Sequence, residues 1–137
     1  MTSADTEQLQ DVFRRESRSL LQYARESSPY ASGDDRRVLA EVQRVATEET
    51  TALAAFGGFL ADQRVPLPYL SAFPMVFTDL NFVTVRYLLP KLVAEQKRDL
   101  AQLEAAAGAL TDAPSRAAVR GLVDLHHRHL KELEGLV

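Results

Sequence analysis

The sequence contains no cysteine, which excludes disulfide bonds, thiolate metal sites and cysteine nucleophiles. It also lacks an apolar run of the roughly 20 residues that a membrane-spanning helix requires. The most apolar region, residues 65–89, is interrupted by three prolines and by Asp79 and Arg86. We therefore expect no insertion into a membrane.

Neither sign of charge dominates the chain, since 16 lysines and arginines stand against 19 aspartates and glutamates without a long run of either. Such a chain lacks the basic footprint of a nucleic-acid-binding protein, and we expect no nucleic-acid partner. The first ten residues are polar and acidic, unlike a signal peptide, so a cytoplasmic location is expected. With 137 residues, six glycines and six prolines, the chain is expected to fold as a single domain, residues 1–137.

Apolar residues recur with helical spacing in four segments that are separated by turn-forming residues. The expected helices begin after Ser3 or Asp5 and end near Glu26, run from Asp34 to Gln63, begin at Thr78 or Asp79 and end near Ala107, and run from Asp112 to the C-terminus. Pro90 lies inside the third segment, where it removes a backbone hydrogen bond and is expected to kink the helix. The predicted fold class is therefore all-α.

The lengths of the connections predict how these helices are arranged. The first and last links are short, so each joins its two helices into an antiparallel hairpin. Residues 65–77 can extend to roughly 40 Å, close to the roughly 45 Å length of a helix of some 30 residues. The sequence thus predicts an antiparallel four-helix bundle with a long crossover between the second and third helices.

Each predicted helix carries one polar residue at the centre of its apolar stripe. The stripes include Tyr23 in the first helix and Phe82 in the third, and the four central polar residues are Glu16, Glu49, Gln96 and His126. Glu16 and Glu49 are equally distant from the first turn, and Gln96 and His126 are equally distant from the last. We therefore predict that all four lie in one layer in the middle of the core.

Two interpretations of this layer follow from the cost of burying a carboxylate without a partner. In the first, the layer is free of metal: a protonated His126 lies between Glu16 and Glu49, and the Gln96 amide donates to one of the carboxylates. In the second, a single Fe, Mn or Zn ion is held by Glu16, Glu49 and His126, with the Gln96 oxygen or water completing its shell. The sequence leaves both open.

At these residues the chain resembles the ferritin-like superfamily, four-helix bundles with a long crossover and a di-iron or di-manganese carboxylate site. The resemblance implies that Glu16 is the ligand of the first helix, while Glu49 and His126 each keep half of a Glu-x-x-His motif. Three other ligand positions of the family are changed, to Ala52, Gln96 and Val123. A degenerate site is therefore implied, which is non-catalytic or binds at most one metal ion, and enzymatic activity is not expected.

A different class of function is also open, an interaction or dimerisation module whose metal-free polar layer only fixes the register of the helices. The apolar crossover, around Tyr69, Phe73 and Phe77, is expected to pack across the bundle or to form a homo-oligomer interface. No Gly-x-Ser-x-Gly motif or other nucleophile and base pair is found, so hydrolase chemistry is not predicted.

Three further expectations concern two histidines, a pair of glycines and one tyrosine. His127 and His129 lie on the flanks of the fourth apolar stripe and are expected to be solvated. The Gly57-Gly58 pair is expected to mark the close approach of another backbone. Tyr23 is expected to pack in the core with its hydroxyl hydrogen-bonded.

Overall fold

The computed structural model describes all 137 residues, Met1–Val137, and contains helices but no β-strand. The prediction of an all-α fold is confirmed. Five α-helices and one 3-10 helix take the place of the four helices expected from the sequence: α1 (Ser3–Ser17), α2 (Leu20–Ser27), α3 (Asp35–Asp62), η1 (Met75–Leu80), α4 (Val85–Ala109) and α5 (Ala113–Glu134). None of these helices is both long enough and apolar enough to cross a membrane.

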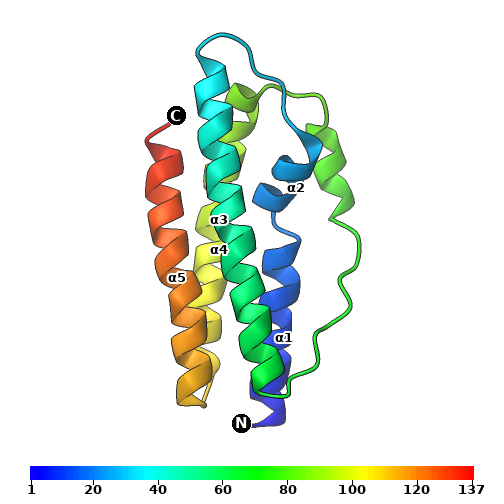
Figure 1. Cartoon of the computed structure of the whole chain (residues 1–137), viewed down its shortest axis with the longest axis vertical. Helices are drawn as coiled ribbons and strands as arrows, with labels where there is room; N and C mark the ends of the chain where they lie inside the picture. The colour runs from blue at the N-terminus through cyan, green and yellow to red at the C-terminus, as the bar shows by residue number, and fades with distance from the viewer.

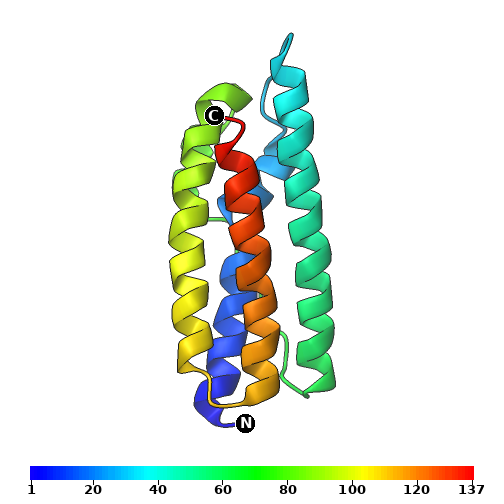
Figure 2. The same cartoon turned by 90° about the vertical axis from the view of Figure 1, so that its left-hand side faces the viewer.

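The helices lie alongside one another, with α1 and α2 following each other along one line (Figures 1 and 2). From α2 the chain turns back into α3, and from α4 it turns back into α5, so each of these pairs is antiparallel (Figure 1). The segment between α3 and α4 returns along the outside of the molecule from one end to the other (Figure 1). As predicted for a long crossover, α3 and α4 therefore run in the same direction.

The buried apolar residues form two separate clusters, one toward each end of the helices. One cluster joins α1, α3, α4 and α5 through residues that include Leu9, Val12, Leu60, Leu103 and Val119. The other joins α2, α3, α4 and α5 and includes Leu21, Val42, Val45, Leu92 and Leu133. The predicted polar residues lie between the two sets along their helices, so the core is divided at the height of the polar layer.

The start of α1 differs from the start predicted for the first helix. It begins one residue after Thr2, which is its N-cap, so neither Ser3 nor Asp5 has that role. Thr2 accepts a hydrogen bond from the Asp5 backbone at 3.0 Å, and Asp5 accepts one from the Thr2 backbone at 3.1 Å. This reciprocal pair is a capping box, which satisfies two of the free N–H groups of the helix start.

The same predicted helix is also broken, because α1 ends at Ser17 and α2 begins at Leu20. Ser19 is the N-cap of α2, and its hydroxyl accepts a hydrogen bond from the Gln22 backbone at 3.2 Å. A serine that bonds to the backbone in this way competes with helical continuation. The break lies within three residues of Glu16, next to the polar layer.

The third predicted helix begins later than expected. Met75–Leu80 forms the 3-10 helix η1, and α4 begins at Val85 with Thr84, not Thr78 or Asp79, as its N-cap. Two backbone hydrogen bonds with Tyr30, from Val85 N–H at 2.8 Å and to the Val83 carbonyl at 3.1 Å, hold residues 83–85 extended. Phe82 precedes this extended stretch and is fully exposed, so its assignment to the apolar core stripe was wrong.

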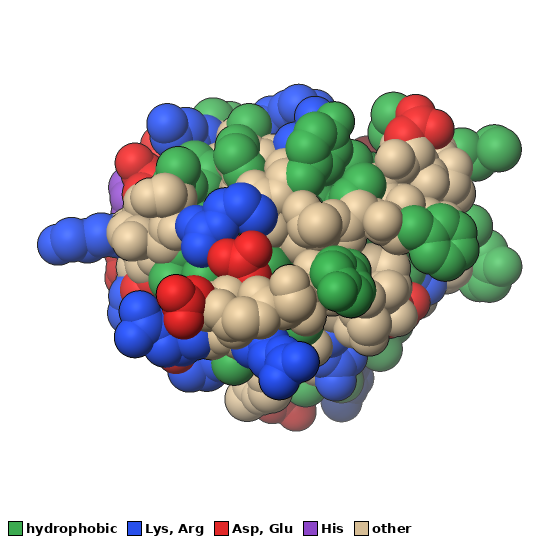
Figure 3. All heavy atoms as spheres, turned by 90° about the horizontal axis from the view of Figure 1, so that it is seen from above, with side chains coloured by type: hydrophobic (Ala, Val, Ile, Leu, Met, Phe, Trp, Pro, Cys, Tyr) green, Lys and Arg blue, Asp and Glu red, His purple; other side chains and the backbone are tan.

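The crossover is only partly packed against the helices. Phe73 and Phe77 contact the ring of Tyr23, with centroid distances of 5.3 and 5.6 Å, and the Tyr23 hydroxyl bonds to Asn81. Tyr69 and Met75 instead remain 88% and 84% exposed. Figure 3, which looks onto the end that carries the start of α3, shows hydrophobic side chains among charged ones on this face.

The glycine pair in α3 does not mark a close backbone contact. A side chain at Gly57 would meet only the ring of Phe13, at 3.3 Å, and one at Gly58 would meet nothing within 4 Å. The expectation that another backbone approaches this pair was therefore wrong.

Candidate functional site

The four polar residues predicted to form a core layer are all buried, with 1% or 2% of each residue exposed. Glu16 comes from α1, Glu49 from α3, Gln96 from α4 and His126 from α5. Each has apolar residues one turn before and one turn after it, although for Glu16 the later one, Leu20, belongs to α2. Four different helices thus supply one polar side chain each.

Three of these side chains bring ligand atoms to one place. His126 Nε2 lies 2.9 Å from Glu16 Oε2 and 3.8 Å from Glu49 Oε2. One ligand atom from each of the three residues lies within 4.8 Å of the others. Two carboxylate oxygens and one imidazole nitrogen are a set that Mn, Fe and Zn accept.

None of these three converging atoms makes a hydrogen bond, although all are buried. His126 Nε2 is close to Glu16 Oε2, yet the directions at the two atoms do not satisfy hydrogen-bond geometry. Buried polar atoms are nearly always hydrogen-bonded, because leaving one unpaired costs about 1–3 kcal/mol. Glu16 and His126 form an ion pair when the ring is protonated, so the three atoms can share either a proton or a cation.

The other ring nitrogen of His126 is paired, which fixes the orientation of the ring. His126 Nδ1 lies 3.1 Å from the carbonyl oxygen of Leu122, one turn earlier on α5. In the neutral ring, Nδ1 carries the proton and donates it to this carbonyl, so the lone pair of Nε2 faces the two carboxylates. A backbone carbonyl commonly orients a metal-binding histidine in this way.

Two residues that sequence reasoning missed hold the second oxygen of Glu49. Glu49 Oε1 accepts hydrogen bonds from Ser19 Oγ at 2.8 Å and from Gln22 Nε2 at 2.9 Å. Gln22 also donates to the Ala46 carbonyl at 3.1 Å and accepts from the Thr50 hydroxyl at 2.9 Å. The signal was present in the sequence, since Ser19-x-x-Gln22 has the spacing of a helix N-terminus.

Gln96 supplies a buried carbonyl oxygen without a partner. Its Oε1 makes no hydrogen bond, and the residue is 1% exposed. An amide oxygen is a neutral ligand for hard and borderline cations. The residue types of the predicted layer therefore all fit a metal site, with Gln96 as the uncharged member.

Burial and mutual charge shift the pKa values of this group. Burial, followed by the charge of Glu16, raises the pKa of Glu49 to about 7. Burial alone lowers the pKa of His126, but its contact with Glu16 and the nearby carboxylates outweigh burial and raise it to about 9. Without a cation, the site therefore retains protons near neutral pH.

Asp99 is a further acidic residue of the site that the sequence did not single out. Burial, together with the charges of Glu16 and Glu49, raises the pKa of Asp99 to about 7, while His126 opposes the rise. Asp99 lines a surface cavity of about 240 Å³ that also contains Ser19. Ser19 donates a hydrogen bond to Glu49, so only the Ser19 side chain separates this cavity from the Glu49 carboxylate.

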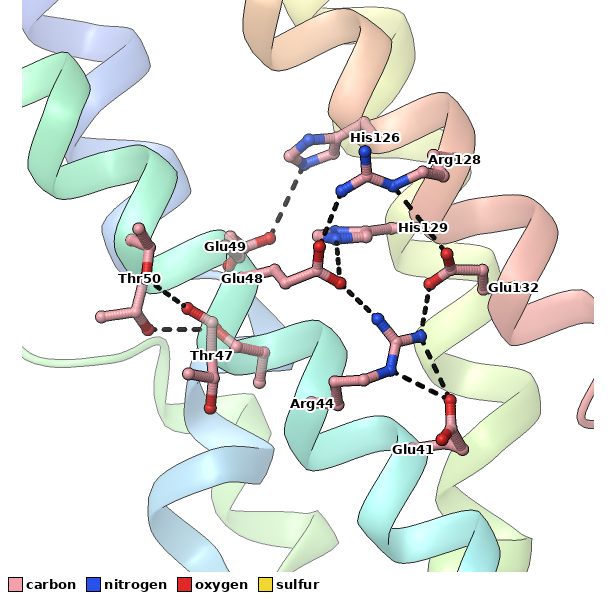
Figure 4. A network of polar contacts seen from close by, with 12 residues as sticks. Glu41, Arg44, Thr47, Glu48, Glu49, Thr50, His126, Arg128, His129 and Glu132 are labelled. Atoms are coloured by element: carbon pink, nitrogen blue, oxygen red, sulfur yellow. Dashed lines mark hydrogen bonds and ion pairs between the residues drawn. The ribbon is translucent and has the colours of Figure 1, made fainter.

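The remaining histidines divide between surface and core. His127 is exposed as expected and lies 3.0 Å from Glu104. His129 is fully buried, so its predicted solvated position was wrong. It turns toward Glu48 on α3, beside the core site (Figure 4). The packing of α3 against α5 covers the flank of the stripe, which the helical wheel of α5 alone does not show.

Neither a family model, nor a curated protein, nor a solved structure matches this chain. Two carboxylates, an imidazole and an amide oxygen can hold a cation.

Proposed function

We propose that the protein binds a single divalent transition-metal ion, Fe, Mn or Zn, through Glu16, Glu49 and His126. The observation that carries the proposal is the convergence of three buried ligand atoms, none of which has a hydrogen-bond partner. Gln96 Oε1 or water completes the shell. The two carboxylates balance the charge of one divalent ion, so the occupied site carries no net buried charge.

We further propose that the fold is a four-helix bundle of the ferritin-like type, in which α1 and α2 together form the first helix. The parallel direction of α3 and α4, joined by a crossover along the outside, supports this proposal. Ala52 and Val123 occupy positions where that family has ligands, and neither side chain can coordinate a metal. Too few ligands remain for two bridged ions, so we propose a one-metal site without ferroxidase activity.

The metal-free interpretation accounts less well for the same contacts. A network that only fixes helix register gains its stability from hydrogen bonds between its members. In this layer Glu16 Oε2, Glu49 Oε2, His126 Nε2 and Gln96 Oε1 make no hydrogen bond, and Glu16 and His126 meet only as an ion pair. Four buried polar atoms without a hydrogen bond weigh against a purely structural role.

Metal content tests the proposal. After incubation with Zn²⁺ and removal of unbound ion, elemental analysis of the wild type is compared with Glu16→Gln and with Glu26→Gln. Glu26 lies on the same first segment but is exposed, so its substitution controls for the loss of one negative charge. We expect Glu16→Gln to hold one equivalent of metal fewer than both other proteins. Equal content in all three would refute the proposal.

As a second candidate, we propose that the crossover forms a homo-oligomer interface. The exposure of Tyr69 and Met75, at 88% and 84%, favours this role. Phe73 and Phe77 are turned inward against Tyr23 and position the segment instead. Light scattering on the wild type and on Tyr69→Ser tests it: we expect an oligomer that the substitution weakens, and a monomeric wild type at high concentration would exclude it.

A further inference from the structure

A second group of potential metal ligands lies between α3 and α5, outside the core site. Glu48 on α3 faces His129 and Glu132 on α5, and one ligand atom from each lies within 4.8 Å of the others. His129 and Glu132 are three residues apart on one helix, so both project from the same face. Figure 4 shows this group beside His126 and Glu49.

His129 is the unusual member of this group. Its ring is fully buried, and neither Nδ1 nor Nε2 has a hydrogen-bond partner. Nε2 points into the group, 3.7 Å from Glu48 Oε1, which is too long for a hydrogen bond. Burial lowers the pKa of His129 to about 4, so at neutral pH the ring is uncharged and has a lone pair to donate.

The charged side chains around the group carry one net negative charge, which favours a cation. Three carboxylates, Glu41, Glu48 and Glu132, are paired with two guanidinium groups, Arg44 and Arg128, which leaves one negative charge in excess. Arg44 and Arg128 are 43% and 55% exposed, so both can turn toward solvent when an ion approaches. Each carboxylate oxygen also has two lone pairs, and one guanidinium contact does not exhaust them.

We propose that Glu48, His129 and Glu132 form a second site for a divalent transition-metal ion, at the surface between α3 and α5. The imidazole favours Zn²⁺, Cu²⁺ or Ni²⁺ over Mg²⁺ and Ca²⁺, which prefer oxygen ligands. Glu48 and Glu132 are 35% and 32% exposed, so the ion reaches this site directly from solvent. The site is separate from the core site and does not require that site to bind metal.

Zn²⁺ binding measured by equilibrium dialysis and titration calorimetry tests this site, with His129→Leu and Glu132→Gln as the variants. Leucine replaces the unpaired imidazole with an apolar side chain of similar size, so the variant is expected to fold at least as stably. Glu132 is partly exposed, and Glu132→Gln removes a charge without disturbing the core. His127→Asn is the control, because it removes an exposed histidine two residues from His129.

We expect His129→Leu to bind one Zn²⁺ fewer than the wild type, Glu132→Gln to bind this ion at least about tenfold more weakly, and His127→Asn to bind normally. Glu16→Gln reports on the core site independently. If Glu16→Gln changes nothing while His129→Leu removes one ion, the core proposal fails and the second site stands. Unchanged stoichiometry and affinity in both His129→Leu and Glu132→Gln, with the fold verified by circular dichroism, would overturn the second site.

Discussion

His126 has a different role at each of its two ring nitrogens. Nδ1 is bound to its own helix through the Leu122 carbonyl, and Nε2 faces two carboxylates. Protonation of Nε2 and binding of a metal to Nε2 exclude each other, because both use the same lone pair. The protonation state of the site in the metal-free protein is therefore the first property to test.

We predict that the metal-free protein loses stability as pH rises from 6.5 to about 9. Folding raises the pKa of His126 from 6.5 to about 9, so its contribution is complete below pH 6.5 and disappears as pH rises through 9. The pKa of Glu49, raised from 4.5 to about 7, acts in the same direction at lower pH. For His126 alone the loss amounts to about 3 kcal/mol.

Urea denaturation in the presence of a chelator, at several pH values above 6.5, measures this loss. His126→Gln is the matched variant, and its stability should vary much less over the same range. At lower pH His129 has the opposite effect. Burial lowers its pKa in the folded protein from 6.5 to about 4, so the free energy of unfolding decreases as pH falls below 6.5 and the unfolded chain takes up the proton. A wild-type stability that is constant between pH 6.5 and 9 would contradict the assigned protonation of His126.

Ser19 both caps α2 and donates a hydrogen bond to Glu49. We predict that Ser19→Ala lowers the free energy of unfolding by about 2 kcal/mol, since it removes a helix cap and leaves a buried carboxylate short of one donor. Urea denaturation measures the loss. Ser32→Ala, at an exposed serine, is the control and should change stability by less than about 0.5 kcal/mol.

Periodicity was sufficient to predict the inward direction of Glu16, Glu49, Gln96 and His126, because each lies on a regular helix among apolar neighbours. It was insufficient for Ser19 and Gln22, which point at Glu49 only because the helix breaks between them and Glu16. His129 was also missed, since its burial depends on the neighbouring helix. The helical wheel therefore misses residues whose position depends on a second helix or on a break, even where, as at Ser19, a capping pattern marks the break.

At the scale of the elements, Gly57 and Gly58 provide a matched pair within α3. We predict that Gly58→Ala raises the free energy of unfolding by about 1 kcal/mol, because alanine has the higher helix propensity and its methyl group meets nothing within 4 Å. Gly57→Ala should gain less or lose stability, since its methyl group would lie 3.3 Å from the Phe13 ring. Thermal denaturation of both variants checks the order, and a larger gain at Gly57 would contradict the packing described.

The backbone of the turn before α4 can be tested at Phe82. Phe82 has a φ of +64° and a fully exposed side chain, so it bears a left-handed backbone without any packing. We predict that Phe82→Gly is more stable than Phe82→Ala by about 1 kcal/mol, because only glycine adopts this φ without strain. Equal melting temperatures of the two variants would show that the turn does not require a left-handed residue.

Element boundaries were predicted well where prolines end a helix or an aspartate caps its start. α3 ends at Asp62, close to the predicted Gln63 and before Pro66 and Pro68, and α5 begins one residue after its N-cap Asp112. The start of α4 was placed too early because Thr78 and Asp79 imitate an N-cap. Its true position depends on the bridge between Tyr30 and Thr84, a contact between distant residues that local composition does not encode.

At the scale of the whole molecule, the polar layer separates two apolar clusters that would otherwise form one continuous core. A divalent ion in this layer would join α1, α3 and α5 at the point where apolar packing is interrupted. We predict that Zn²⁺ at 100 times its dissociation constant raises the free energy of unfolding by about 3 kcal/mol. His129→Leu is the protein to use, because the core site is then the only proposed site.

Thermal denaturation with and without Zn²⁺ measures this gain. Glu16→Gln in the His129→Leu background should show little or no shift, whereas Glu26→Gln in the same background should behave like its parent. Equal shifts in all three proteins would mean that the ion stabilises the chain from elsewhere.

X-ray diffraction at the zinc absorption edge, from crystals grown with Zn²⁺, tests the central proposal most directly. We predict an anomalous peak about 2.0–2.2 Å from Glu16 Oε2, Glu49 Oε2 and His126 Nε2. An ordered core without such a peak, in which these three atoms are hydrogen-bonded to one another, would contradict it.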